Sequence, residues 1–161
     1  MKENSIIRED VIIGKNSKVW NFCNLYGCKI GENTQVGSYC EIKEGAEIGD
    51  NCRFQSYVFV PEGTKIGNYV FIGPRVTFLN DKYPTSKKAI EKRWNLEAAV
   101  VEDRVSIGGG VTILPGVRIG KGSMIGAGSV VTKDVPEYKI IYGNPAKIVG
   151  DVRDNKYKIF I

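Results

Sequence analysis

The chain has 161 residues, of which 42% are hydrophobic and 25% are charged, and its formal net charge is +5. This composition is typical of one globular domain, here residues 1–161, and excludes a disordered chain. The sequence contains no histidine, which excludes a histidine-ligated zinc site. It shows neither a basic leader followed by an apolar stretch nor a run of about eighteen apolar residues, so we expect a cytoplasmic protein with no membrane partner.

A large apolar residue recurs at every sixth position through most of the chain. These positions are Ile7, Ile13, Val19, Leu25, Ile30, Val36, Ile42, Ile48, Phe54, Val60, Ile66, Ile72, Phe78, Val101, Ile107, Ile113, Ile119, Ile125 and Val131. A helix requires a period near 3.6 and a half-buried strand a period of 2, whereas six residues make one short strand and one tight turn. Three units close a coil of about eighteen residues, so the repeat predicts an all-β parallel β-helix of roughly six coils.

Small residues complete the repeat. A small or β-branched residue, such as Thr34 or Val58, lies four positions after each large one from Ile30 onward except Phe78, and we expect it to point inward. Glycine directly follows many of the large residues, as Gly31 and Gly108 do. There it permits positive φ at a corner and a close approach of neighbouring coils.

The four cysteines favour buried thiols rather than a metal centre. Cys23, Cys40 and Cys52 occupy the small inward position, and their spacing matches no zinc pattern. Cys28 lies where the spacing between two large apolar residues shortens to five. We therefore expect no metal and no cysteine nucleophile.

The repeat is interrupted over residues 79–100, and insertions of this kind often carry the binding site of a solenoid. The candidate substrate-binding residues there are Asn80, Asp81, Tyr83, Lys87, Arg93 and Trp94, with Lys88 beside them. Cationic groups beside aromatic rings suit an anionic ligand that contains a ring, such as a nucleotide sugar. A loop that packs against other copies of the chain, with its lysines in solvent, explains the same residues.

Two motifs near the C-terminus give the chain a family resemblance. The segment IGAGSVVTKDVP followed by GNPAK resembles the C-terminal signature of the hexapeptide acyltransferases, and residues 137–161 form a short extension. The resemblance implies a left-handed β-helix, a homotrimer and acetyl-CoA as cosubstrate. The segment GPRVTFLNDKYPTS is similar to one branch of that family, the N-acetyltransferases that acylate an amino group of nucleotide-linked deoxysugars, dTDP-linked or UDP-linked.

The same resemblance assigns roles to individual residues. Asn80 matches a position that contacts the substrate amine, and Gly109 matches one whose N–H polarises the thioester carbonyl. The implied coenzyme A site consists of Gly109, Ala127, Thr132, Lys133, Pro145, Ala146 and Lys147. Each role has a structural alternative: a turn at Asn80 and Asp81, a crowded corner at the glycine triplet, and solvated surface for the lysines.

The lack of histidine favours an amine as the acceptor. An amine with a pKa of roughly 8 is about 10% neutral at pH 7, so reaching its reactive form costs only about 1.4 kcal/mol. Full deprotonation of a hydroxyl with a pKa near 16 would cost about 12 kcal/mol, so a hydroxyl acceptor requires a general base. Asp81, Glu102 and Asp103 are carboxylate candidates for that base, but an unperturbed carboxylate is weak.

Three other functions remain open at this point. An O-acetyltransferase acting on a sugar hydroxyl would keep the fold and the coenzyme A site, and a non-catalytic scaffold would keep the fold alone. Nucleic-acid binding is disfavoured because the positive residues are scattered among acidic neighbours rather than gathered in a recognised module.

Overall fold

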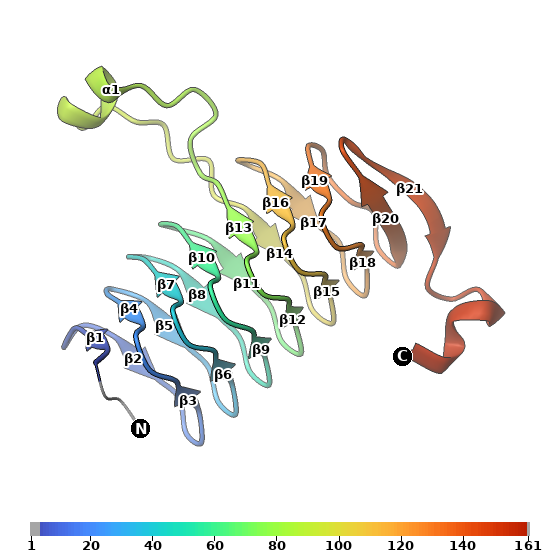
Figure 1. Cartoon of the computed structure of the whole chain (residues 1–161), viewed down its shortest axis with the longest axis horizontal. Coiled ribbons are helices and arrows are strands. Elements are labelled where there is room, and N and C mark those ends of the chain that lie inside the picture. Colours follow the sequence, from blue (N-terminus) through green and yellow to red (C-terminus); the bar gives the residue numbers. More distant parts are fainter. Residues whose placement is uncertain (1–3, 161) are drawn as a thin grey trace.

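The structure, a computed structural model, describes residues 4–160 as stacked coils with one protruding loop (Figure 1). Residues 1–3 and 161, which the single-domain prediction includes, lie outside the described residues. The two-residue strands are β1 (Ile6–Ile7), β2 (Ile12–Ile13), β3 (Lys18–Val19), β4 (Asn24–Leu25), β5 (Lys29–Ile30), β6 (Gln35–Val36), β7 (Glu41–Ile42), β8 (Glu47–Ile48), β9 (Arg53–Phe54), β10 (Phe59–Val60), β11 (Lys65–Ile66), β12 (Phe71–Ile72), β13 (Thr77–Phe78), β14 (Val100–Val101), β15 (Ser106–Ile107), β16 (Thr112–Ile113), β17 (Arg118–Ile119), β18 (Met124–Ile125) and β19 (Val130–Val131).

Every third strand stacks into the same sheet, so the predicted parallel β-helix is confirmed. Sheet A has the order β1-β4-β7-β10-β13-β16-β19, sheet B has the order β17-β14-β11-β8-β5-β2, and sheet C contains β18-β15-β12-β9-β6-β3. The second residue of each strand is the large apolar residue of the repeat. It points inward, and side chains such as Leu25, Ile42 and Phe78 are 0% exposed.

Three corners join the sheets, and each is named here by the sheets that the chain leaves and enters. The second residue after each large apolar residue lies on a corner, in a column that runs along the solenoid. The C/A corner carries Asn21, Ser38, Ser56, Pro74, Gly109 and Ala127. The A/B corner carries Glu44, Glu62, Asn80, Pro115 and Lys133, and the B/C corner carries Glu32, Asp50, Asn68 and Asp103.

The prediction that glycine supplies positive φ directly after the large residue is wrong. Positive φ falls two residues later, where asparagine, tyrosine and arginine serve as well as glycine; examples are Asn33 at 54° and Tyr39 at 62°. The early glycines are instead required for close approach. A Cβ on Gly31 would lie 2.7 Å from the carbonyl carbon of Gly49, and one on Gly108 would lie 2.5 Å from the nitrogen of Ala127.

The predicted burial of the cysteines is confirmed. All four are free thiols in the core, including Cys28, whose pKa burial raises to about 11. The small inward residues, such as Thr34 and Val58, are buried beside them. Within residues 4–160, no group of three or more histidine, cysteine, aspartate or glutamate residues could hold a metal ion.

The insertion leaves the solenoid between β13 and β14 and projects away from it (Figure 1). It contains one short helix, α1 (Ser86–Ile90), which buries none of its residues. The base of the loop is closed because Glu97 N donates to Asn80 O (2.9 Å) and Gly116 N donates to Glu97 O (2.8 Å). The described part of the chain contains no helix with the length and apolarity to cross a membrane.

The predicted C-terminal extension is a hairpin that lengthens sheet C. Strand β20 (Lys139–Gly143) pairs with β18 in parallel, and β21 (Ala146–Asp151) returns antiparallel to β20. The short 3₁₀ helix η1 (Asn155–Phe160) follows. The turn between β20 and β21 carries the GNPAK motif and lies at the end of the C/A corner.

Candidate active site

The C/A corner presents a backbone N–H at Gly109 for which residues 4–160 provide no acceptor. At the B/C corner, the equivalent N–H groups are capped by a side chain from the next coil. Glu32 N donates to Asp50 Oδ1 (2.7 Å) and Asp50 N donates to Asn68 Oδ1 (2.8 Å). At the C/A corner, the residue in the capping position above Gly109 is Ala127, whose methyl group cannot accept a hydrogen bond. Among residues 4–160, the Gly109 N–H therefore has no protein acceptor.

Open space adjoins this N–H. A Cβ built on Gly110 or on Gly128 would meet no atom within 4 Å, so nothing covers the corner beside Gly109 and Ala127. Both glycines have positive φ, of 69° and 70°. The neighbouring amides of Gly108 and Gly110 are used by the coil, because they donate to Ile125 O and Pro74 O. Gly109 thus combines a free donor with room for a carbonyl oxygen, as an oxyanion site requires.

The GNPAK turn continues the same corner. The Gly143 N–H donates to Ser129 Oγ (3.1 Å), which fixes the start of the turn to the coil that carries Ala127. Ala146 packs partly against the core, whereas Pro145 and Lys147 are exposed. The structure therefore brings Gly109, Ala127 and this turn together along one edge of sheet A.

A polar cluster occupies the A/B corner, on the opposite edge of sheet A. Asn80 Nδ2 donates to Glu62 Oε2 (2.9 Å), and the other oxygen of Glu62 pairs with Lys43 Nζ (2.5 Å). The Lys43 and Glu62 side chains are only 22% and 18% exposed. The contact with Glu62 fixes the NH₂ group of the Asn80 carboxamide on the protein side, which leaves its oxygen as the free acceptor.

The opposite charges of Lys43 and Glu62 stabilise each other. Burial by itself raises the pKa of the Glu62 carboxyl, but hydrogen bonds from Lys43, from its own backbone and from Asn80 outweigh burial, so its pKa lies below the usual value. Burial opposes the charge of Lys43 too, but the bond to Glu62 gives it a raised pKa. Glu62 is therefore a stable anion and a poor base, suited to orienting Asn80 rather than to taking a proton.

Glu62 and Lys43 are residues that the sequence interpretation missed. Nothing in the six-residue repeat distinguishes them from solvated corner positions. The available signal is the coil length, because Glu62 precedes Asn80 by 18 residues and so stacks directly on it.

Of the other predicted loop residues, Trp94 lies near the coils, whereas the rest are exposed or pair within the loop. Trp94 returns to the coils, with Lys43 Nζ 6.0 Å from its ring centroid. Tyr83 is 69% exposed, Lys87 is exposed, and Arg93 pairs with Glu91 within the loop. Lys88 does not face a ligand, since its Nζ donates to Tyr83 O (2.8 Å).

The candidate bases are engaged in local structure. Asp81 Oδ1 accepts the Tyr83 N–H (2.9 Å), which is the turn role considered for it, and Asp103 Oδ1 accepts the Asn68 N–H (2.7 Å). Glu102 accepts hydrogen bonds from Arg118 Nε and Lys121 N, both at 2.8 Å.

The predicted site residues lie on two separate edges of sheet A. Gly109 stacks on Pro74, and Asn80 is the sixth residue after Pro74 along one side of the coil. At about 3.3 Å per residue, this side is on the order of 15–20 Å long. Thr132 and Lys133 follow β19 and are exposed on the Asn80 edge, away from Ala127. One copy of the chain therefore does not bring its two sets of site residues together.

Fold and repeat place the protein among parallel β-helices built from hexapeptide units. The family model "Bacterial transferase hexapeptide (six repeats)" matches residues 27–62 and 98–133. The matched coils are similar to the hexapeptide repeats of bacterial transferases, and the predicted resemblance to hexapeptide acyltransferases is confirmed.

Individual relatives are similar over part of their length. A galactoside O-acetyltransferase of Lactococcus lactis is 33% identical over 94 residues, which is 58% of this chain and 45% of that protein. A dTDP-3-amino-3,6-dideoxy-alpha-D-galactopyranose 3-N-acetyltransferase of Aneurinibacillus thermoaerophilus is 39% identical over 53 residues, which is 33% of this chain and 28% of that protein. The matches thus span less than half of these curated relatives.

A solved structure, described as a galactoside acetyltransferase in complex with coenzyme A, has the same fold. It superposes with a TM-score of 0.69 at 29% identity, over 81% of this chain and 67% of that one.

Proposed function

We propose that this protein is an acetyl-CoA-dependent N-acetyltransferase whose acceptor is the amino group of a nucleotide-linked amino-deoxysugar. The observation that carries the proposal is the uncapped Gly109 N–H beside an open corner, next to the Ala127 edge and the GNPAK turn. The likeness to acetyltransferases, one of them acting on a dTDP-linked 3-amino sugar, supports the substrate class.

The chain's own groups suffice for acyl transfer to an amine. Bound acetyl-CoA supplies the activated acetyl group, and Ala127 and the GNPAK turn lie beside the open space at Gly110 and Gly128, with Lys147 as a charge for phosphate. Gly109 N–H donates to the oxygen that becomes negative when the acceptor nitrogen attacks the thioester carbon. As the C–N bond forms, the C–S bond breaks, and the thiolate or water takes the amine proton.

Asn80 orients the acceptor in this mechanism. Its carboxamide oxygen, left free by the contact with Glu62, accepts a hydrogen bond from the amine and points the nitrogen lone pair at the thioester. Asp81, Tyr83, Lys87, Arg93 and Trp94 supply the surrounding polar and aromatic surface. Most of the rate enhancement then comes from positioning and from the fixed N–H dipole rather than from a protein base.

The proposed reaction takes place in a homotrimer, because the two edges of one copy do not meet. A cyclic assembly that turns sheet A toward its axis brings the A/B corner of each copy to the C/A corner of the next, so Asn80, Thr132 and Lys133 of one copy face Gly109 and Ala127 of another. The outward residues of the C-terminal half of sheet A are uncharged: Phe59, Thr77, Thr112 and Val130. The loop also exposes apolar side chains, since Ile90 is 82% and Leu96 54% exposed.

The decisive experiment compares amine and alcohol acceptors. The purified protein is incubated with acetyl-CoA and dTDP-linked or UDP-linked 3-amino and 4-amino sugars, and free thiol release is followed. Matched sugars with a hydroxyl in place of the amine are the control. Transfer to an amine supports the proposal, whereas transfer to the hydroxyl sugars alone contradicts it.

An O-acetyltransferase is the second candidate, because the galactoside enzymes are similar to this chain over a larger part of it. The residues argue against it. The sequence contains no histidine, Glu62 has a lowered pKa, and Asp81, Glu102 and Asp103 are engaged in hydrogen bonds. None of these four carboxylates is suited to activate a hydroxyl.

A further inference from the structure

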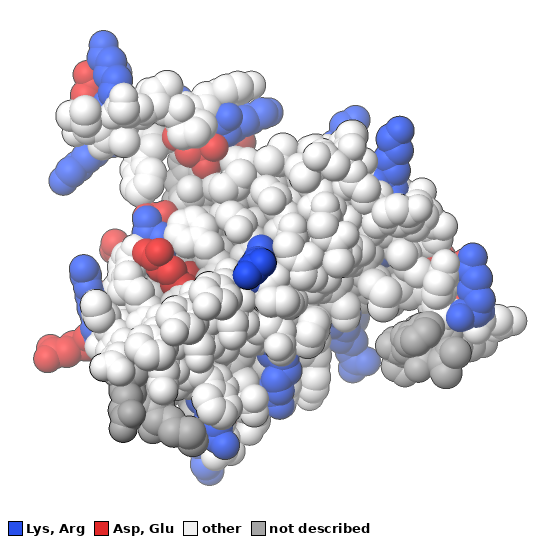
Figure 2. Space-filling view, in the orientation of Figure 1, with Lys and Arg blue, Asp and Glu red and all other residues white. Residues whose placement is uncertain are grey.

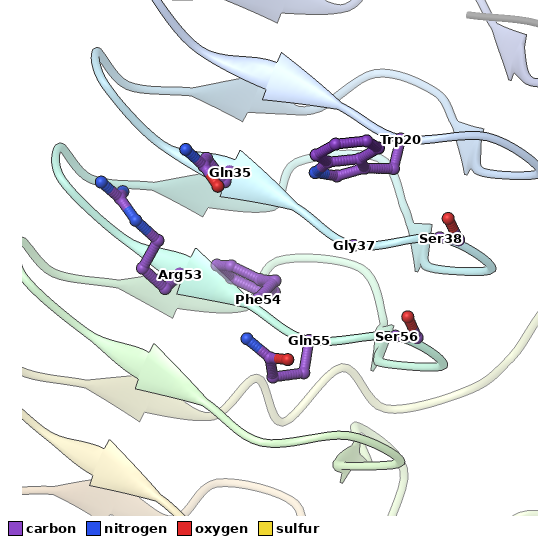
Figure 3. Close-up of a pocket in the computed structure, with 8 residues that line it drawn as sticks. All are labelled: Trp20, Gln35, Gly37, Ser38, Arg53, Phe54, Gln55 and Ser56. Atoms are coloured by element: carbon purple, nitrogen blue, oxygen red, sulfur yellow. The ribbon is translucent and has the colours of Figure 1, made fainter. Parts of the chain in front are cut away.

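A pocket lies on sheet C, further toward the N-terminus than Gly109. Its volume is about 210 Å³, and Figure 3 shows its lining: Trp20, Gln35, Gly37, Ser38, Arg53, Phe54, Gln55 and Ser56. Gly37 has no side chain, so a gap remains between the Trp20 indole and the Gln55 carboxamide. The indole is 42% exposed and offers a flat apolar surface to a ligand.

The polar groups of this pocket are available. Among residues 4–160, the side chains of Gln35, Gln55, Ser38 and Ser56 make no hydrogen bond with other protein atoms. Among the described residues, the backbone N–H groups of Ser38 and Ser56 have no acceptor either. Pro74, one coil above Ser56, has no side-chain acceptor, and the Ser56 hydroxyl, one coil above Ser38, does not accept from the Ser38 N–H. The pocket therefore offers two hydroxyls, two carboxamides and two backbone donors.

The charge of the pocket is positive. Arg53 is held in place because its Nη1 donates to Asn33 O (2.7 Å) and Cys52 O (2.8 Å), which leaves the rest of the guanidinium for a ligand. No carboxylate lines the pocket. Arg75 is exposed on the next coil, with its guanidinium carbon 5.9 Å from the Tyr57 ring centroid, and lies between the pocket and Gly109. Figure 2 shows one face of the molecule, on which most of the charged side chains lie toward the margins.

We propose that this pocket binds a nucleoside diphosphate, with the base on Trp20 between Gln35 and Gln55 and the diphosphate on the Ser38 and Ser56 amides, near Arg53 and Arg75. This inference rests on the proposed function, for which it locates the nucleotide of the acceptor. Ser56 and Gly109 are two coils apart in one column, which is about 10 Å at 4.8 Å per coil. A diphosphate directed along the corner would place its sugar at Gly109.

Coenzyme A contains a nucleoside diphosphate too, and geometry separates the two sources. The GNPAK turn, expected to hold the adenosine end of coenzyme A, is about four coils from Gln55, or on the order of 19 Å. The acceptor nucleotide and coenzyme A are therefore expected to bind at the same time.

The repeat supplies a matched pair of variants for the test. Arg75 and Arg104 occupy the same repeat position, with φ of 59° and 60°. Each lies over a tyrosine ring, with its guanidinium carbon 5.9 Å and 5.8 Å, respectively, from the ring centroid. Arg104 lies on the B/C corner, away from the pocket. Arg75→Asn and Arg104→Asn remove the same charge and aromatic contact, and asparagine tolerates positive φ.

Calorimetric titration with dTDP and UDP, with and without saturating coenzyme A, tests the inference. We expect Trp20→Leu and Arg75→Asn each to weaken dTDP or UDP binding by about tenfold, with Arg104→Asn unchanged and coenzyme A affinity unaffected. Equal losses in both arginine variants, displacement of dTDP by coenzyme A, or no binding of either nucleotide would overturn it. Amine acetylation that persists without nucleotide binding refutes only this inference, whereas nucleotide binding without any transfer refutes the proposed reaction.

Discussion

Replacing Ala127 by asparagine would close the proposed oxyanion site without adding charge. At the B/C corner, Asn68 stands in the equivalent position and caps the Asp50 N–H at 2.8 Å. An asparagine at 127 can therefore reach the Gly109 N–H by the same geometry. The variant copies a contact that the fold already uses, so we expect it to fold normally.

The expected changes in kcat and Tm follow from the oxyanion donor that is lost and the backbone hydrogen bond that is gained. Removing one oxyanion donor costs about 10²- to 10³-fold in kcat. The new backbone cap contributes about 0.5–1.5 kcal/mol, which for a chain of this size raises Tm by roughly 1–6 °C. The combination of higher stability and lower activity is specific, because a damaged fold would lower both.

Steady-state kinetics and thermal unfolding on the same preparations test this prediction. Ala127→Leu is the control, since leucine has nearly the shape of asparagine but cannot accept a hydrogen bond. A fall in kcat of the same size in both variants would mean that bulk at the corner, rather than capture of the N–H, causes the loss. Full activity of Ala127→Asn with a raised Tm would refute the oxyanion role of Gly109.

Three further predictions concern other parts of the site and the fold. Glu62→Gln should lower kcat/KM by about 10- to 100-fold in the wild-type background but not in the Asn80→Ala background, because Glu62 acts through Asn80. Glu44→Gln, one coil earlier on the same corner, is the control. Equal losses of kcat/KM in both backgrounds would contradict the positioning of Asn80 by Glu62. Since the pKa of Glu62 is depressed, the stability it contributes is present above its unfolded pKa of about 4.3 and is lost below it, so the Tm gap between wild type and Glu62→Gln should shrink below about pH 4. Log kcat/KM should rise with pH up to the amine pKa, roughly 8, and should follow that pKa when the acceptor is changed; an inflection that stays fixed would indicate a protein base.

Periodicity predicted the solenoid well because every coil obeys the same packing constraint. The large residue must point inward in each unit, so one six-residue rule places Ile42 and Phe78 in the core alike. The position of positive φ could not be read from glycine, since Tyr39 and Arg75 adopt it too. There the corner is fixed by backbone hydrogen bonds to neighbouring coils, such as Tyr39 N to Asn21 O, and the residue type follows only weakly.

The site was harder to predict than the fold because it depends on stacking. Gly109 was assigned by resemblance, but what makes its N–H available is the lack of a cap at Ala127, one coil later. Glu62 acquires its role from Asn80 in the same way. These relations appear in the sequence only when residues are compared at the spacing of a whole coil rather than of one repeat.

The two edges of sheet A explain how a scaffold without histidine can support acyl transfer. A β-helix presents rigid rows of corner amides, and each row is either capped by side chains or left open. The C/A row is open at Ser38, Ser56 and Gly109, which gives donors for a diphosphate and for an oxyanion along one line. The A/B row contributes Asn80, whose orientation Glu62 fixes. Because the rows lie on opposite edges of one copy, activity should depend on assembly, and the chemistry left to the protein is alignment of a nitrogen that is already nucleophilic.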